Sequence, residues 1–290
     1  DAIFSLLPPE YAMFRLPVAL LGLAILTTLN LRGAKESVVP LVPIFLIFVI
    51  THAFAIIYAL ATHVVELPAV AVNTAHETSS TISQIGLFGT MILLMRAYSL
   101  GAGTYTGIEA VSNGMSVLRE PKVETGKKTM RYMAVSLSVV VMGLMIAYLV
   151  YNVGHVQGKT LNAVLFENMT ATWGGGRTVF MLVTLISEAL ILFIAAQTGF
   201  LGGPRILANM AVDRWMPSKF ATLSDRLVTQ NGILLMGSAA MVTMFLTGGS
   251  VRLLVVFYSI NVFITFCLSQ AGMVRHWWTT KGLKWKRKLA

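Results

Sequence analysis

The sequence predicts an all-α polytopic membrane protein, and composition and apolar spacing are the two observations that predict it. Hydrophobic residues make up 56% of the 290 residues and charged residues only 12%, whereas about a quarter of the residues of a soluble domain are charged. The apolar residues gather in stretches long enough to cross a hydrocarbon core, which takes about 20 residues. The seven predicted spans are residues 14–31, 38–62, 85–118, 132–153, 177–211, 232–248 and 253–274. Because no soluble segment is left between them, we predict a single transmembrane domain over residues 1–290.

Two of these spans differ from the others. Residues 14–31 and 38–62 are plain apolar runs, and so are the fourth, sixth and seventh spans. The third and fifth spans are longer and contain glycines and polar residues. Residues 63–84 contain neither lysine nor arginine, so we interpret them as an external connection.

The basic residues predict the orientation. Most of the 22 lysines and arginines lie in three loops and in the tail, all on one predicted side of the membrane. Lys and Arg mark cytoplasmic loops, so we place these loops and the C-terminal end in the cytoplasm and the protein in the inner (plasma) membrane. This distribution also explains the net charge of +10 better than nucleic-acid binding does. Residues 1–13 lack a signal-peptide pattern, so we expect a piece of a longer protein, with preceding and following helices missing.

The segment "SLGAGTYTGIEAVSNG", around residues 99–114, predicts a discontinuous helix inside the third span. Three glycines within seven residues each lower helix stability by about 1 kcal/mol relative to alanine. A break at membrane depth exposes carbonyl and N–H groups, and discontinuous helices build ion and substrate sites in this way. The alternative is that the glycines only let two helices approach closely. The candidate ligands are Gly101, Gly103, Thr104, Tyr105, Thr106 and Gly107.

Glu109 follows this predicted break and falls in the first turn of the second half-helix. The positive end of the helix dipole favours a carboxylate there. Acids inside a membrane are functional by default, so Glu109 either changes its protonation during transport or is a fixed structural partner. Both alternatives stay open.

Several motifs resemble the amino acid/polyamine/organocation (APC) permeases. "GAGTYTGIEAVSNG" followed by "LREPKVETGKKTM" resembles the sixth helix and the next loop of these permeases, and "NLRGAKES" at 30–37 resembles the turn between their fourth and fifth helices. Residues 195–233 and 257–273 are similar to the eighth and tenth helices of the KimA-type potassium importers within that superfamily. The resemblance implies the LeuT-like fold, of which this chain would hold helices four to ten of about twelve.

The resemblance also implies a function. It indicates a secondary active transporter that works by alternating access and imports potassium by proton symport. Thr106 and Tyr258 would then line the cation site. A cation-coupled amino acid permease and a structural membrane subunit of a larger assembly are the alternatives. The expected partners are the transported ion or small molecule, protons, the lipid bilayer and a second copy in a homodimer.

Two charged residues lie inside predicted spans. Glu188 stands where the KimA-type importers carry a small polar residue, and we expect it to be protonated, to pair with Arg177 or Arg96, or to reach the external interface. The interface is the reading that we favour. Arg96, five residues before the first glycine of the break, would repel competing cations, pair with an acid or extend toward the interface.

Glu120 is a candidate for an inner gate. It lies in the basic loop of residues 119–131, where the simple interpretation is a solvated loop that meets anionic headgroups. The sharper hypothesis is that Glu120 and Lys127 or Lys128 pair with Asp213, Arg214 or Asp225 of the other large cytoplasmic loop.

Other chemistry has little support in the sequence. There is no nucleophile elbow, phosphate-binding loop or HExxH motif, so we do not expect an enzyme. Cys267 is the single cysteine, and His52 stands alone on an apolar span. The remaining histidines lack the spacing of metal ligands, so we expect neither a metal nor a cofactor, and no nucleic-acid partner.

Overall fold

The part of the chain that the structure describes is helical, without a strand. It is a computed structural model that describes residues 1–290 except 34–40, 102–110, 112–114, 116–117, 283–284 and 287–290. Within the described ranges, six helices are long and apolar enough to cross a membrane. The sixth predicted span, residues 232–248, corresponds to the apolar helix α8 (Gln230–Leu246), which at 17 residues is slightly shorter than the usual 20. The predicted all-α class is therefore confirmed.

The described residues form two compact units. The first comprises Asp1–Thr78 and Ile108–Gly249, and the second comprises Ser79–Gly107 and Ser250–Ala290. The boundary between the units falls inside the long helix α3 (Leu67–Leu100), and the second unit also contains α9 (Val251–Thr280). The first unit contains η1 (Ile3–Leu6), η2 (Pro9–Phe14), α1 (Arg15–Leu31), α2 (Leu41–Thr62), α5 (Lys122–Val150), α6 (Leu161–Met169), α7 (Gly175–Val212), η5 (Ser218–Phe220) and α8.

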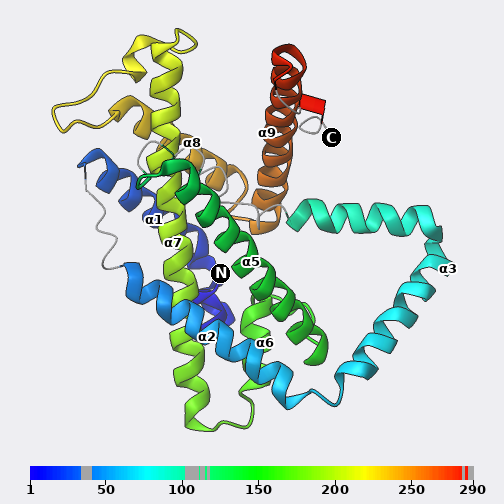
Figure 1. Cartoon of the computed structure of the whole chain (residues 1–290). Helices are drawn as coiled ribbons and strands as arrows, with labels where there is room; N and C mark the ends of the chain where they lie inside the picture. Colours follow the sequence, from blue (N-terminus) through cyan, green and yellow to red (C-terminus); the bar gives the residue numbers. More distant parts are fainter. Residues whose placement is uncertain (34–40, 102–110, 112–114, 116–117, 283–284, 287–290) are drawn as a thin grey trace. The chain divides into compact units, whose positions relative to one another are not determined.

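The 38-residue helix α7 organises the first unit (Figure 1). Helices α2 and α8 both pack on it, α1 packs on α8, and α5 packs on α2. Small residues permit this packing, as in other membrane bundles. A Cβ atom added at Gly143 of α5 would lie 2.6 Å from Cγ2 of Ile56, and one added at Gly237 of α8 would lie 2.6 Å from Oγ1 of Thr27. At both contacts only glycine lets the helices come so close.

The largest core cluster lies where α2, α5, α6 and α7 meet. Phe166 of α6 and Leu185 of α7 are fully buried there, against the alanines Ala55 and Ala59 of α2. A set of aromatic side chains extends this cluster, and in it Trp173 donates a hydrogen bond of 3.2 Å from Nε1 to the hydroxyl of Tyr58. The short helix α6 thus packs through its buried side chains against the three long helices.

Residues 63–84, which we interpreted as an external connection, are mostly helical. Helix α3 begins at Leu67, and Pro68 fits its first turn because an N–H group is not needed there. The threonine hydroxyls of this segment donate to carbonyl oxygens four residues earlier, as Thr74 does to Val70, so its polar residues are compatible with a helix. The helical path is interrupted at Gly86, where φ is 73°.

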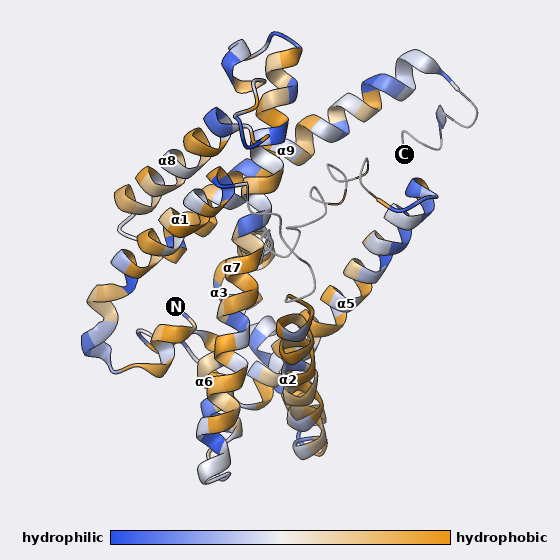
Figure 2. Cartoon of the chain, turned by 90° about the vertical axis from the view of Figure 1, so that its left-hand side faces the viewer, coloured by the Kyte–Doolittle hydropathy of each residue, from blue (hydrophilic) through white to orange (hydrophobic). Residues whose placement is uncertain are grey.

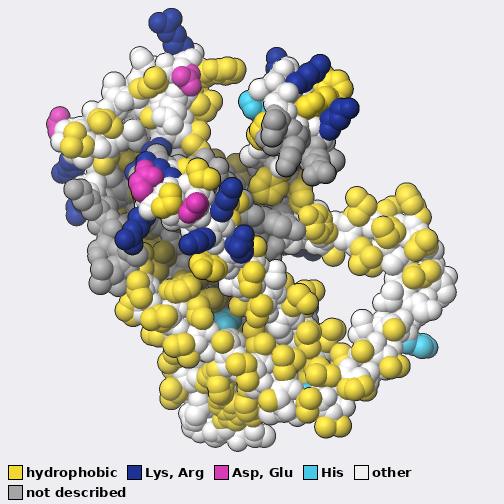
Figure 3. Space-filling view, in the orientation of Figure 1, with side chains coloured by type: hydrophobic (Ala, Val, Ile, Leu, Met, Phe, Trp, Pro, Cys, Tyr) yellow, Lys and Arg dark blue, Asp and Glu magenta, His cyan; other side chains and the backbone are white. Residues whose placement is uncertain are grey.

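Hydropathy and charge follow the helices of the first unit. Hydrophobic residues predominate along α2, α5 and α7 in Figure 2, and hydrophilic residues gather at the first turns of α5. In Figure 3, Lys and Arg side chains gather near the start of α5 and near the C-terminal end of α7. The basic loops before α5 and after α7 therefore lie on one side of this unit. That this side is cytoplasmic stays a prediction.

Candidate functional site

Most residues of the predicted cation site lie outside the described residues. This holds for Gly103, Thr104, Tyr105, Thr106, Gly107 and Glu109, and for most of the discontinuous helix predicted around residues 99–114. Helix α3 ends at Leu100, and Gly101 follows it directly. Tyr258 is half-buried in α9. The cation site itself therefore stays a prediction.

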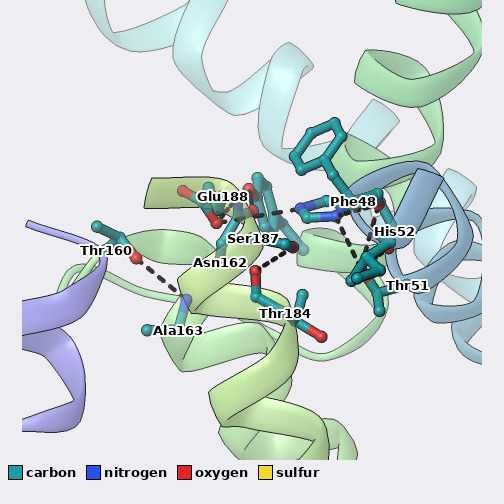
Figure 4. Close-up of polar contacts among 11 residues, drawn as sticks. Phe48, Thr51, His52, Thr160, Asn162, Ala163, Thr184, Ser187 and Glu188 are labelled. Carbon is teal, nitrogen blue, oxygen red and sulfur yellow. Dashed lines mark hydrogen bonds and ion pairs between the residues drawn. The ribbon is translucent and has the colours of Figure 1, made fainter. Parts of the chain in front are cut away.

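Glu188 is the sequence-predicted site residue about which the structure says most. It lies in α7, thirteen residues after the first residue Gly175, and its side chain is only 14% exposed. Its Oε2 atom accepts a hydrogen bond of 3.1 Å from Nδ2 of Asn162 and lies 4.0 Å from Nε2 of His52 (Figure 4). We favoured a carboxylate that reaches the external interface, and this was wrong, because the side chain turns into the packed helices.

His52, on α2, is held in one orientation. Its Nδ1 atom lies 2.9 Å from the backbone oxygen of Phe48, its side chain is 2% exposed, and its ring lies edge-on to that of Phe166. A carbonyl oxygen only accepts hydrogen bonds, so Nδ1 carries the proton. The buried Nε2 atom has no hydrogen-bond partner and faces Glu188.

Asn162, on α6, connects this pair to α5. The hydroxyl of Tyr148, on α5, donates to Oδ1 of Asn162, which fixes the amide so that its Nδ2 atom faces Glu188. Thr160 caps α6 by accepting a hydrogen bond of 3.2 Å from the N–H group of Ala163. Since this cap sets where α6 begins, it also sets the position of Asn162 in the first turn. Four helices thus contribute one polar side chain each to the cluster, which we call the His52–Glu188 cluster.

The remaining candidates have simpler surroundings. Arg96 is exposed on α3 within the second unit. Glu120 accepts a hydrogen bond of 3.2 Å from the backbone N–H group of Lys122 and lies 3.6 Å from its Nζ atom. Its side chain is 77% exposed, so the ion pair that the structure shows is local and does not reach the loop after α7.

Sequence reasoning missed three members of the cluster. His52 was noticed only as a lone histidine, although a histidine inside a span is itself a signal. Asn162 and Tyr148 gave no signal, because a polar residue in a connection and a tyrosine near a helix end are both ordinary. In the described part of the chain, no group of three or more His, Cys, Asp or Glu side chains is placed to hold a metal.

Comparison with known proteins gives the family. The sequence model of the family described as amino acid permease matches residues 3–290. The chain belongs to the amino acid permease family. The permease is also 33% identical over 293 residues to the potassium transporter KimA of Bacillus subtilis (strain 168), an alignment that covers 100% of this chain and 46% of that relative. It therefore spans about half the length of the curated relative that it matches.

Family membership agrees with the fold and with the resemblance found in the sequence. Six membrane-length helices and a family match across nearly the whole chain make the permease a multi-pass membrane protein. They place it among transport proteins rather than enzymes. The His52–Glu188 cluster is thus an ionisable site within the membrane-spanning part of a permease, where such groups mark ion pathways and proton relays.

Proposed function

We propose that the full-length permease imports potassium together with protons, as a secondary active transporter that works by alternating access. The alignment with a potassium transporter along the whole of this chain carries the proposal. It includes the segments of the predicted helix break and of α9, which hold the candidate cation ligands. We further propose that the protein lies in the plasma membrane with its basic loops in the cytoplasm, and that it forms homodimers.

In this proposal the potassium ion loses water to oxygen ligands of the broken helix. Carbonyl and hydroxyl oxygens are the ligands that potassium sites use, and residues 101–107 with the hydroxyl of Tyr258 supply both kinds. Glu109, at the start of the second half-helix, would stabilise the occupied site. Glu188 would take up the coupled proton. Arg96 would repel competing cations that approach the site, and Glu120 would form part of the inner gate.

A cation-coupled amino acid permease is the second candidate, and the family description favours it. An amino acid carboxylate would bind the N–H groups of the second half-helix, where the dipole favours negative charge. The oxygens that would hold potassium would then hold the coupling ion.

Complementation separates the two candidates. The full-length protein is expressed in a host that lacks potassium uptake, and in parallel it is tested with a panel of radiolabelled amino acids. Growth at low potassium without uptake of any amino acid is expected. Amino acid uptake without potassium-dependent growth would overturn the potassium proposal.

A second variant tests whether the broken helix forms the site. Replacing both Gly103 and Gly107 by leucine removes the two glycines most able to interrupt the helix, so we expect uptake to be lost while membrane insertion is kept. Undiminished uptake by this variant would contradict a site at the break.

A further inference from the structure

We propose that His52 and Glu188 together bind a single proton and that this shared proton couples proton movement to transport. The existence of the site rests on the contact between α2 and α7. Its role in coupling rests on the proposed function, and the two parts are tested separately below.

The geometry defines which atoms hold the proton. Nδ1 of His52 donates its hydrogen to the carbonyl oxygen of Phe48, 2.9 Å away. In the neutral ring, the lone pair of Nε2 therefore faces the carboxyl group of Glu188. One proton between Nε2 and Oε2 satisfies both atoms, either as an imidazolium beside a carboxylate or as a neutral ring beside a carboxylic acid. Without that proton, a lone pair and a negative charge face each other in a buried site, which is unfavourable. The pair is therefore built to hold one proton.

Besides His52, three groups act on Glu188. The other groups acting on Glu188 are Asn162 of α6, which does not titrate, Tyr148 of α5, and the amino group of Asp1 beside η1. The hydroxyl of Tyr148 already donates its hydrogen to Oδ1 of Asn162. The carboxyl group of Glu188 and the ring of His52 are thus the two titratable side chains that face each other between α2 and α7.

Both groups of the pair are largely buried. The side chain of Glu188 is 14% exposed and that of His52 only 2%.

The distance between the two groups links protonation to helix position. The separation of 4.0 Å between Nε2 and Oε2 is about 1 Å longer than a hydrogen bond between nitrogen and oxygen. A bound proton favours closing this gap, and its loss favours keeping the gap open. Because His52 and Glu188 belong to two helices that pack on each other, proton occupancy biases the spacing of α2 and α7, and a two-state bias of this kind is what coupling requires.

Transport assays test the coupling. Full-length wild type and the variant Glu188→Gln are reconstituted into liposomes, and rubidium is measured as a potassium analogue in two ways: accumulation driven by a pH gradient, and exchange at equilibrium. The variant keeps a neutral side chain that resembles the protonated acid. We expect accumulation to fall by at least about tenfold while exchange stays within about twofold of wild type.

Glu167→Gln is the matched control, because it removes a carboxylate of α6 whose partner is Lys159, at 2.6 Å. We expect it to accumulate rubidium like wild type. Equal accumulation by Glu188→Gln and wild type would overturn the coupling role while leaving the proposed function intact. Loss of both accumulation and exchange by a well-folded Glu188→Gln protein would also overturn it, because Glu188 would then serve ion binding or structure.

A spectroscopic measurement tests the site without transport. The purified full-length protein is labelled with nitrogen-15 histidine, and the resonances of His52 are assigned by their loss in His52→Gln. Since the two groups share one proton, the titration of His52 must change when Glu188 is replaced by glutamine. An identical His52 titration in wild type and Glu188→Gln would overturn the shared site. If wild type moved no rubidium at all, the proposed function would fail, and this titration alone would decide whether the shared proton exists.

Discussion

The buried polar contacts of helix α7 toward α1 and toward α2 are built differently. Toward α1, Gln197 and Asn30 exchange two hydrogen bonds of 2.9 and 3.1 Å, and Nδ2 of Asn30 also donates to the carbonyl oxygen of Leu26. Toward α2, Glu188 faces His52 across 4.0 Å without a hydrogen bond. The amide pair is neutral and satisfied by its own hydrogen bonds, whereas the acid and base pair has no hydrogen bond between its two groups.

In the proposed mechanism, this difference separates a structural contact from a functional one. Two complementary amides need no proton and no movement to satisfy each other, so the contact between α1 and α7 is the same at every pH near neutrality. The contact between α2 and α7 has two protonation states that differ in the attraction between the helices. A transporter needs both kinds, because a helix that moves against one neighbour has to stay fixed to another.

The largest expected effect comes from combining the two substitutions of the ionisable pair. If His52 and Glu188 hold one proton between them, His52→Gln and Glu188→Gln each reduce gradient-driven accumulation by about tenfold or more, and the double variant is no worse than either alone. Rubidium accumulation in liposomes, measured for all four proteins, gives the double-mutant cycle. Losses that multiply in the double variant would show that the two residues act independently.

Breaking the amide pair is expected to reduce stability but not coupling. Asn30→Leu leaves the buried amide of Gln197 without its partner, which costs about 1–3 kcal/mol of unfolding free energy. Thermal unfolding in detergent measures this loss, which we expect to be equal at pH 6 and pH 8 because neither amide titrates.

The control for this variant removes the second amide as well. Asn30→Leu with Gln197→Leu no longer contains an unpaired buried group, so it is expected to regain part of the lost stability. A strong dependence of the Asn30→Leu effect on pH, or a loss of gradient coupling at normal exchange, would contradict the structural role of this contact.

The smallest effect is expected at Glu120, which tests whether ionisable contacts outside the buried cluster also matter. Its exposed pair with Lys122 is of the kind that contributes about 0–1 kcal/mol, so Glu120→Lys is expected to change uptake by less than about twofold. Labelling of a cysteine at position 106 from the cytoplasmic side is expected to be unchanged. Increased labelling, reversed by charge reversal at Arg214, would instead support the inner gate.

Much of the fold could be predicted from the sequence, and less of the candidate site. The long apolar runs predicted the helices, and the motif "GAGTYTGIEAVSNG" with residues 195–233 pointed to the family that the comparisons confirm. The helical part of residues 63–84 was missed because its polar side chains, such as Thr74, bond to their own helix. The favoured interpretation of Glu188 was wrong because its partners, His52 and Asn162, are distant in the sequence.

The sequence by itself determined that the chain is a helical membrane protein and that a carboxylate lies within one of its spans. Only the tertiary structure decided that this carboxylate faces a histidine of α2 and an amide of α6. The physical reason lies in the solvent of these helices. In a soluble protein an apolar stripe shows which face of a helix is buried, but in a membrane the lipid-facing side is apolar too. Ile57 is 66% exposed on the same helix on which His52 is 1% exposed, so hydropathy does not indicate which face of α2 meets α7.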